Sequence, residues 1–266
     1  MTVAPVRPRL GPREDVARRL AILAPLLAVA AALVGGVLTA RPSEAVVRPP
    51  TPGTSLTVVE LFTSQGCSSC PPANANLVRL AGRPDVLALS FNVTYWDQLG
   101  WKDTFGEEAF TRRQRAYQRG LGNNNVWTPQ VVVDGRADVV GGRMSGIDSL
   151  IERHRPFAGP ALRFGQASVS LAGGAAPATP ADVWLIRYEP RPIAVPVGRG
   201  ENGGRTLLHA GVVRDLVRLG GWNGPNTGYR LPPASRPDLL TAVLVQAPNG
   251  GPHPRSGAGL IRQNRS

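Results

Sequence analysis

The chain has 266 residues, of which 42% are hydrophobic, so it is long and apolar enough for one large or two ordinary globular domains. This composition excludes a wholly disordered or collagen-like chain. The formal charge of +12 comes from 30 basic and 18 acidic residues, and the basic residues are spread along the whole length. Because nucleic-acid binding requires basic residues that cluster on one helix or stripe, we expect no nucleic-acid partner.

Residues 1–45 have the features of an export segment. Five arginines within residues 7–19 precede an uncharged run over residues 20–40, and small residues follow at the two positions that a signal peptidase recognises. The same run is also long enough to stay in a bilayer as an N-terminal membrane anchor. We therefore expect an exported protein, periplasmic or secreted, that is either released or anchored to the inner membrane. The proline-rich residues 46–54 are typical of a short linker.

Residues 55–158 alternate between strand and helix patterns, which favours an α/β domain. A stretch of β-branched and aromatic residues is followed directly by a C-x-x-C sequence, then by a helical pattern and then by a second apolar strand. This order predicts a βαβ unit. The expected strands are residues 56–62, 86–93, 128–135 and 137–140, and the expected helices are residues 73–81, 107–121 and 145–155.

Residues 159–266 have a different character. Short alternating apolar runs, broken by Pro and Gly clusters, predict an antiparallel β module rather than further βαβ units. The runs cover residues 161–171, 183–188, 193–197, 206–217 and 239–246. A module of this kind buries modest apolar area alone, so we expect it to pack tightly on the preceding domain. The side chains expected in the joint core are Trp184, Ile186, Leu207 and Trp222.

The sharpest chemical signal is the pair Cys67 and Cys70, the only cysteines of the chain. A C-x-x-C ring closes little chain entropy and so stabilises a fold little, which favours a redox purpose. We expect Cys67 to lie at a helix N-terminus, where it is the more exposed thiol with the lower pKa, and Cys70 to lie one turn inside and to resolve the mixed disulfide. Ser68 and Ser69 can hydrogen-bond the sulfur atoms.

Two alternatives to redox catalysis remain open at this stage. The first is a fixed disulfide in a non-catalytic binding protein. The second is metal binding, for which ligands are scarce, because the three histidines lie far along the chain and Met144 is the only methionine after the export segment. We predict no cofactor and no metal site, although a copper carrier with two thiolate ligands stays conceivable.

Other residues are candidates through their position beside the cysteines. Pro129 opens a strand, and in the company of a C-x-x-C pair we expect the Thr128–Pro129 bond to be cis and to bring the Thr128 backbone to the sulfur atoms as a docking edge for substrate. Trp96 suits either peptide binding or packing. Pro71 and Pro72 lack N–H groups, so the helix after the cysteines should be kinked or begin late.

Four segments of the sequence, at residues 60–73, 95–103, 127–130 and 200–207, resemble the family of secreted bacterial proteins called domain of unknown function 1223. That family is placed in the thioredoxin-like superfamily. The resemblance implies a thioredoxin-like fold, Cys67 as the attacking thiol, Cys70 as the resolving thiol and Pro129 as the cis-proline opposite them. The chain departs from the family at residues 92–94, where Asn-Val-Thr stands in place of the usual His-Val-Asp.

Glu60 is the candidate proton acceptor that this resemblance suggests. Thioredoxins place a buried carboxylate on the strand before the cysteines, where it takes the proton of the resolving thiol. Glu60 precedes Cys67 by seven residues and has apolar neighbours on both sides. The alternative is an outward residue on an alternating strand.

Together these observations predict an exported thiol–disulfide oxidoreductase that acts on thiol- or disulfide-containing proteins or small molecules. Its fold class is α/β, a thioredoxin-like βαβ core with an appended C-terminal antiparallel β module. Residues 198–203 match G-x-G-x-x-G, but no helix follows, so we predict a hairpin loop and not a dinucleotide site. We expect residues 200–205 to reach the C-x-x-C face and to help select the substrate.

Overall fold

The computed structural model describes residues 56–154 and 160–248 and the backbone of residues 259–261. The expected export segment, residues 1–45, and the linker, residues 46–54, lie outside the described residues. Within the described ranges, no helix is both long and apolar enough to cross a membrane. The described residues belong to one compact unit.

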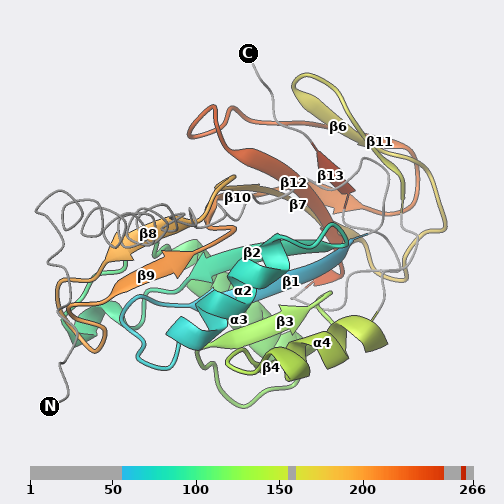
Figure 1. Cartoon of the computed structure of the whole chain (residues 1–266). Coiled ribbons are helices and arrows are strands. Elements are labelled where there is room, and N and C mark those ends of the chain that lie inside the picture. Colours follow the sequence, from blue (N-terminus) through green and yellow to red (C-terminus); the bar gives the residue numbers. More distant parts are fainter. Residues whose placement is uncertain (1–55, 155–159, 249–258, 262–266) are drawn as a thin grey trace, which may run out of the picture. The chain divides into compact units, whose positions relative to one another are not determined.

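The first sheet is mixed and has the strand order β2-β1-β3-β4. Strands β1 and β2 run parallel, with α2 between them along the chain, so the predicted βαβ unit is confirmed (Figure 1). Strand β3 pairs antiparallel with β1, and β4 pairs antiparallel with β3. The bounds of these strands are Thr57–Thr63 for β1, Val86–Asn92 for β2, Gln130–Val133 for β3 and Ala137–Val140 for β4.

Helices cover both faces of this sheet. Successive side chains of a strand point to opposite faces. On β1, Thr63 hydrogen-bonds Asn74 of α2 (Pro71–Ala81), whereas Glu60 pairs with Arg113 of α3 (Glu108–Gly120). Helices α2 and α3 therefore lie on opposite faces of the sheet. A fourth helix, α4 (Met144–Arg153), packs on β3 and β4, and a short 3-10 turn, η1 (Asp97–Leu99), follows β2.

The described residues after α4 form strands that pair antiparallel, as predicted. Their sheets have the orders β10-β7-β12-β13, β11-β6-β5 and β8-β9, so the fold is α/β with a mixed sheet and separate antiparallel sheets. The strand bounds are Leu162–Phe164 (β5), Ser168–Leu171 (β6), Ala181–Tyr188 (β7), Ile193–Pro196 (β8), Thr206–His209 (β9), Val213–Trp222 (β10), Thr227–Arg230 (β11), Leu240–Gln246 (β12) and Gly259–Ile261 (β13).

The apolar run predicted over residues 206–217 is not one strand. It divides into β9 and β10 at Gly211, whose carbonyl oxygen accepts a hydrogen bond of 2.8 Å from the Ser90 N–H on the edge of β2. Gly211 has φ +60°, and a Cβ at this position would lie 2.1 Å from the Ala88 carbonyl oxygen. Only glycine allows the two backbones to approach this closely. The chain thus crosses from the β8–β9 hairpin to the edge of the first sheet.

One hydrophobic cluster joins the first sheet to the C-terminal strands, so the predicted joint packing is confirmed. Ile186 is buried in this cluster and Trp184 packs against it, while Leu207 is buried on β9, which contacts α2. Trp222 belongs instead to a second cluster, because β10 is 10 residues long and its ends, about 30 Å apart, lie in different cores. The C-terminal part contributes Ile186, Tyr188, Ala210, Val213, Leu240, Ala242 and Leu244 to the joint cluster.

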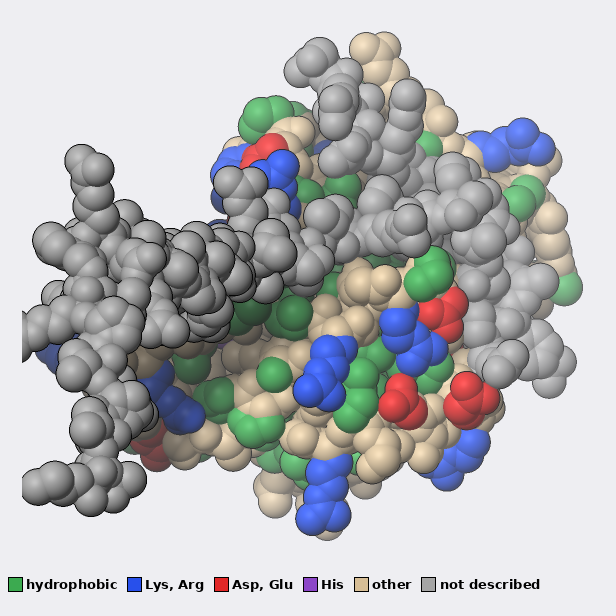
Figure 2. Space-filling model, viewed as in Figure 1, with side chains coloured by type: hydrophobic (Ala, Val, Ile, Leu, Met, Phe, Trp, Pro, Cys, Tyr) green, Lys and Arg blue, Asp and Glu red, His purple; other side chains and the backbone are tan. Residues whose placement is uncertain are grey.

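On the face seen in Figure 2, Lys and Arg side chains lie scattered among acidic and hydrophobic ones rather than along one stripe.

Candidate functional site

The two cysteines lie in a loop between β1 and α2, residues 64–70, which we call the reactive loop. They are joined as a disulfide. Cys70 is the N-cap of α2, and its carbonyl oxygen accepts hydrogen bonds from the N–H groups of Ala73 and Asn74, at 3.0 and 3.1 Å. The expectation that Cys67 begins the helix and that Cys70 lies one turn inside is therefore wrong.

The late start of α2 has a simple cause. Pro71 and Pro72 occupy the first helical positions, where proline fits well, and the expectation of a late start is confirmed. Neither proline has an N–H group, and the next two N–H groups of the helix already bond the Cys70 carbonyl oxygen. The first turn of α2 consequently has few N–H donors left to stabilise a thiolate on Cys67.

Both cysteines are buried, with 0% of each residue exposed, whereas we expected Cys67 to be the more exposed. The neighbouring Ser68 and Ser69 are exposed. Trp96 lies against the reactive loop, where a Cβ on Gly66 would be 3.4 Å from the Trp96 Cβ. Side chains from distant parts of the sequence also bind the loop, and no sequence pattern around the cysteines indicates this.

Ser69 connects Cys67 to the loop before β3. Its hydroxyl oxygen lies 3.3 Å from Cys67 Sγ and donates a hydrogen bond of 3.5 Å to the Thr128 carbonyl oxygen. The Thr128–Pro129 bond is cis, as the sequence predicts. Ser68 instead turns toward the C-terminal strands, where its N–H donates to Glu201 Oε2 at 3.0 Å. The structure thus brings the Ser69 hydroxyl to Cys67 Sγ and the Thr128 carbonyl oxygen to Ser69, whereas the Ser68 N–H binds Glu201.

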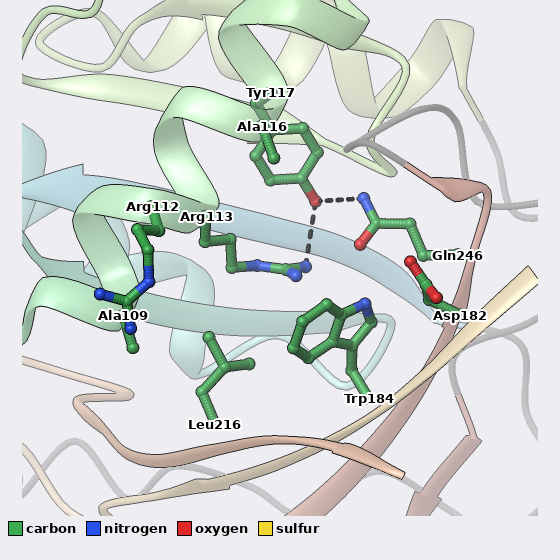
Figure 3. A pocket seen from close by; sticks show the side chains of 9 residues that line it. All are labelled: Ala109, Arg112, Arg113, Ala116, Tyr117, Asp182, Trp184, Leu216 and Gln246. Carbon is green, nitrogen blue, oxygen red and sulfur yellow. Dashed lines mark hydrogen bonds between the residues drawn. The ribbon is translucent and has the colours of Figure 1, made fainter. Parts of the chain in front are cut away.

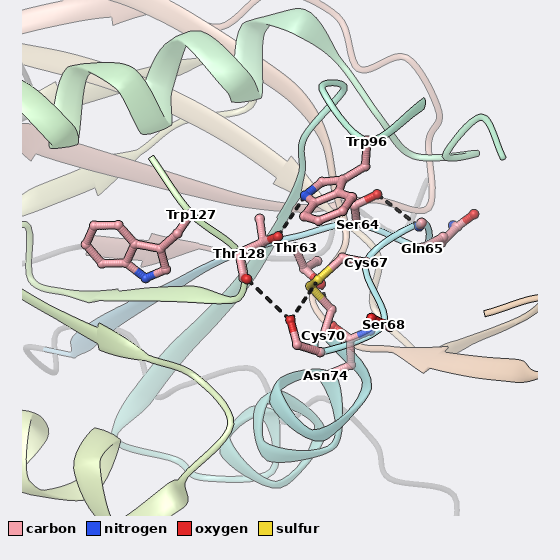
Figure 4. The surroundings of a disulfide bond; sticks show 12 residues. Thr63, Ser64, Gln65, Cys67, Ser68, Cys70, Asn74, Trp96, Trp127 and Thr128 are labelled. Atoms are coloured by element: carbon pink, nitrogen blue, oxygen red, sulfur yellow. Dashed lines mark hydrogen bonds between the residues drawn. A yellow bond between two sulfur atoms is a disulfide. The ribbon is translucent and has the colours of Figure 1, made fainter. Parts of the chain in front are cut away.

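Trp96 is half-buried beside this arrangement. Its Nε1 donates a hydrogen bond of 2.8 Å to Thr128 Oγ1, so its polar edge is already used within the protein. In Figure 4, Trp96 and Trp127 lie on opposite sides of Thr128, with Trp96 on the side of the cysteines. The contacts favour the packing interpretation of Trp96, which covers the reactive loop and orients Thr128.

Gln65 holds the reactive loop to the segment after η1. Its N–H donates to Asp103 Oδ2 at 2.7 Å, and its side-chain oxygen accepts from Trp101 Nε1 at 2.9 Å. Its Nε2 donates to Thr104 Oγ1 at 2.8 Å. Burial raises the pKa of Asp103, against the hydrogen bonds from Asn92 and Gln65. Reasoning from the sequence missed Gln65 and Asp103 as parts of the site, although both lie inside the segments that carry the family resemblance.

The tip of the β8–β9 hairpin, residues 197–205, also binds the reactive loop. Asn202 Nδ2 donates to the carbonyl oxygens of Gln65, at 2.9 Å, and of Cys67, at 2.8 Å. Asn202 is 0% exposed, and Glu201 takes the Ser68 N–H. The predicted approach of residues 200–205 to the C-x-x-C face is confirmed, whereas a role in substrate selection stays a prediction.

Glu60 is buried, with 1% of its surface exposed, so the outward interpretation is wrong. Arg113 binds both of its carboxylate oxygens, through Nε at 2.6 Å and Nη2 at 2.9 Å, and the Tyr117 hydroxyl binds one of them. Burial opposes the charge of Arg113, but Glu60 and Tyr117 together outweigh it through their charges and hydrogen bonds and raise the pKa of Arg113. The Glu60 carboxylate faces α3, on the side of the sheet opposite to α2, and its role as proton acceptor stays a prediction.

A cavity of about 330 Å³ borders the Arg113 end of this network, between α3 and strands of the C-terminal part (Figure 3). The Arg113 guanidinium lies 5.6 Å from the centre of the Trp184 ring, and Gln246 Nε2 donates to the Tyr117 hydroxyl at 3.0 Å. The cavity is lined by Ala109, Arg112, Arg113, Ala116, Tyr117, Asp182, Trp184, Leu216 and Gln246. None of the residues predicted for the site from the sequence lines it.

The structure brings together few metal ligands. Within residues 56–154 and 160–248, no group of three or more His, Cys, Asp and Glu side chains is placed to hold a metal ion. His209 is 1% exposed and packs edge-on against Phe105, with ring centres 5.5 Å apart. Neither ring nitrogen has a hydrogen-bond partner in the described part of the chain, and burial lowers the pKa of His209 to about 4. His253 lies outside the described residues.

Residues 58–246 match the family described as "Protein of unknown function (DUF1223)". The chain belongs to this DUF1223 family. The matched range includes every site residue named above, from Glu60 to Asn202. The hairpin tip is therefore part of the DUF1223 domain and not a separate addition to it.

Two solved structures are similar to this DUF1223 chain. An X-ray structure of a protein from Agrobacterium tumefaciens is 31% identical, covers 80% of this chain and 97% of its own, and superposes with a TM-score of 0.67. HBP35 of Porphyromonas gingivalis is 12% identical, with coverage of 82% and 78% and a TM-score of 0.48. No curated protein matches the chain.

Proposed function

We propose that the chain is an exported thiol–disulfide oxidoreductase with a thioredoxin-like first domain. The observation that carries this proposal is the Cys67–Cys70 pair in the loop between β1 and α2, connected to Thr128 through the Ser69 hydroxyl. The strand order β2-β1-β3-β4, with α2 and α3 on opposite faces, is what a thioredoxin-like domain requires. A C-x-x-C pair beside a βαβ unit is the common setting of such chemistry.

In the reducing direction, the Cys67 thiolate attacks one sulfur of a partner disulfide. The partner S–S bond breaks, a Cys67–partner disulfide forms, and the other partner sulfur leaves as a thiolate that takes up a proton. Cys70 then loses its proton and attacks Cys67 Sγ, which forms the Cys67–Cys70 disulfide and releases the second partner thiol. Two electrons pass from the cysteine pair to the partner, and the reverse sequence oxidises a partner dithiol.

The residues around the pair have separate roles in this scheme. In the reduced protein the Ser69 hydroxyl hydrogen turns from the Thr128 carbonyl oxygen to the Cys67 thiolate, which compensates for the N–H groups that α2 lacks at its start. The Thr128 backbone offers an edge to an extended substrate, in the manner of strand addition. The partner is a protein or small molecule that contains a thiol or a disulfide, and residues 1–45 direct the chain to the periplasm or beyond it.

Substitution of each cysteine tests the function. Cys67→Ser should abolish exchange with a disulfide substrate, because no attacking thiolate remains. Cys70→Ser should instead accumulate mixed disulfides through Cys67, which are visible on a non-reducing gel and identified by mass spectrometry. Ser145→Ala removes an exposed serine hydroxyl on α4 and is the control that should leave exchange unchanged. Mixed disulfides that form through Cys70 in the Cys67→Ser variant would contradict the assignment of roles.

The complete burial of both cysteines favours one other function, a non-catalytic binding protein with a fixed disulfide. The two functions differ in the reduction potential of the Cys67–Cys70 bond, which equilibration with a glutathione buffer measures. A potential below about −300 mV would identify a structural bond and refute the proposed enzyme. A value near those of known exchange enzymes, about −270 to −120 mV, is the expected result.

A further inference from the structure

The hairpin tip, residues 197–205, and the reactive loop, residues 64–70, meet through polar contacts that join parts of the chain far apart in sequence. The tip is itself well ordered by backbone hydrogen bonds, with Val197 N–H to the Arg205 carbonyl oxygen at 2.9 Å and Gly204 N–H to the Val197 carbonyl oxygen at 2.8 Å. Gly200 has φ +74°, and a Cβ there would lie 3.2 Å from the Trp101 Cβ. The tip is therefore packed closely on the site.

Asn202 is the main anchor between the two segments. Its amide nitrogen donates to the carbonyl oxygens of Gln65 and Cys67, and its Oδ1 accepts from Arg205 Nη1 at 2.9 Å. Every polar atom of this buried side chain is therefore bonded, which gives a single well-defined geometry. Because Asn202 binds the carbonyl oxygen of Cys67 itself, it fixes the backbone of the attacking cysteine and keeps the loop covered.

Glu201 acts on the same loop through its charge. Hydrogen bonds from Ser68 lower the pKa of the Glu201 carboxyl, so it is ionised at neutral pH. The carboxylate also occupies the Ser68 N–H, which follows directly after Cys67 and is thereby lost as a donor to a thiolate. The other charged groups of the elements around the loop are Arg205, which bonds Asn202, Asp103, which bonds the Gln65 N–H, and Arg199, Asp97 and Lys102.

We propose that the hairpin tip controls the reactivity of Cys67, with Asn202 as a positioning residue that restricts access to the sulfur and Glu201 as a residue that makes the thiolate less stable. This inference rests on the proposed function, since it concerns the thiolate that exists after the disulfide is reduced. It gives the C-terminal strands a chemical role in the site, in addition to their role in the core. The two effects are separable in a profile of alkylation rate against pH. Access to the sulfur changes the plateau rate at high pH, whereas thiolate stability changes the midpoint.

The experiment follows alkylation of Cys67 by iodoacetamide in the reduced full chain, from pH 4 to 10, with the label at each cysteine quantified by mass spectrometry. Asn202→Ala removes the two hydrogen bonds that hold the reactive loop and the one from Arg205, and should raise the plateau rate at high pH about tenfold without moving the midpoint. Glu201→Gln should lower the midpoint and speed alkylation below it about two- to fivefold, with the plateau unchanged.

Control variants keep each effect interpretable. Glu152→Gln removes an exposed carboxylate on α4 and should leave both plateau and midpoint at the wild-type values. Arg205→Met removes only the hydrogen bond to Asn202 Oδ1 and should raise the plateau rate of alkylation less than Asn202→Ala does. This milder variant keeps the test interpretable if Asn202→Ala folds poorly. Profiles of the Asn202→Ala and Glu201→Gln variants that superpose on wild type would overturn the proposal.

The assay needs no physiological substrate, so it separates this inference from the proposed function. Altered profiles in the two variants together with a reduction potential below about −300 mV would refute the enzyme but not the control by the hairpin tip. Unaltered profiles together with active exchange would refute the control and leave the enzyme intact.

Discussion

Two buried titratable side chains, His209 and Asp134, respond to pH in opposite directions. Burial lowers the pKa of His209 to about 4, so the folded protein keeps this ring neutral at any pH above that value. In the unfolded chain the ring takes up its proton near the usual pKa of 6.5. Burial raises the pKa of Asp134 to about 6, so the folded protein takes up a proton there before the unfolded chain does. As the pH falls from 6 to 4, His209 lowers the free energy of unfolding and Asp134 raises it.

A substitution isolates the effect of His209. The stability attributable to its neutral ring is complete above pH 6.5 and is lost as the pH falls toward 4, which amounts to roughly 3 kcal/mol. His209→Leu should therefore lose less stability between pH 7 and 4.5 than wild type, by about 2 to 3 kcal/mol in urea unfolding experiments. Asp134→Asn should show the opposite change. Equal pH dependence of wild type and His209→Leu would mean that the folded protein protonates this ring freely.

At the residue scale, the sequence could identify candidate chemistry but not its surroundings. The C-x-x-C spacing identifies Cys67 and Cys70, and the prolines after them predict the late start of α2. Glu60 shows what the sequence could not predict. An alternating strand pattern cannot tell a buried carboxylate from an exposed one when both faces of a strand are covered, and the partner that neutralises this one, Arg113, lies 53 residues away.

At the element scale, most strands and helices follow from apolar periodicity, and their ends follow from Pro and Gly. The apolar run over residues 206–217 divides into β9 and β10 at a turn that periodicity does not show. Apolar residues continue on both sides of Gly211, yet the chain must leave the β8–β9 hairpin and approach the edge of β2. β11 was not expected, since Thr227–Arg230 alternates without strong apolar residues on either face.

The crossing at Gly211 gives a sharp test. Gly211→Ala puts a methyl group 2.1 Å from the Ala88 carbonyl oxygen and forces a side chain into positive φ, so we expect a loss of about 3 kcal/mol or more in the free energy of unfolding. Gly142→Ala is a matched control, because nothing lies within 4 Å of a Cβ there, and it should change stability by less than about 0.5 kcal/mol. Similar denaturant midpoints for the two variants would show that the junction at the edge of β2 is dispensable.

At the scale of the whole molecule, the described residues share one main core. Side chains of β7, β10 and β12 lie in the same hydrophobic cluster as those of β1, β2 and α3, and Arg113 stacks on Trp184 of β7. The second cluster lies between β6, β7 and β12 and extends this core without dividing the unit. Removal of the C-terminal strands would expose one side of the first sheet and its buried ion pair.

We therefore expect residues 55–158 expressed alone not to fold cooperatively. The fragment lacks the seven side chains that the C-terminal part contributes to the joint cluster, and its Glu60–Arg113 pair is left partly uncovered. Circular dichroism and urea unfolding of the fragment measure this, with residues 55–266 as the control. A soluble fragment with a single sharp transition and the thiol reactivity of the longer chain would show that the C-terminal part is a separable appendage.

The sequence by itself determined the α/β pattern, the antiparallel C-terminal strands, the late start of α2 and the cysteine pair, because each depends on local spacing, side-chain type or proline geometry. Only the tertiary structure decided that the cysteines are buried, that Glu60 pairs with Arg113, and that Asn202 and Glu201 bind the reactive loop. These features depend on contacts between residues 53 to 137 positions apart, which no local pattern encodes. The residue types of the site therefore follow from local sequence, whereas their burial and their partners follow from tertiary packing.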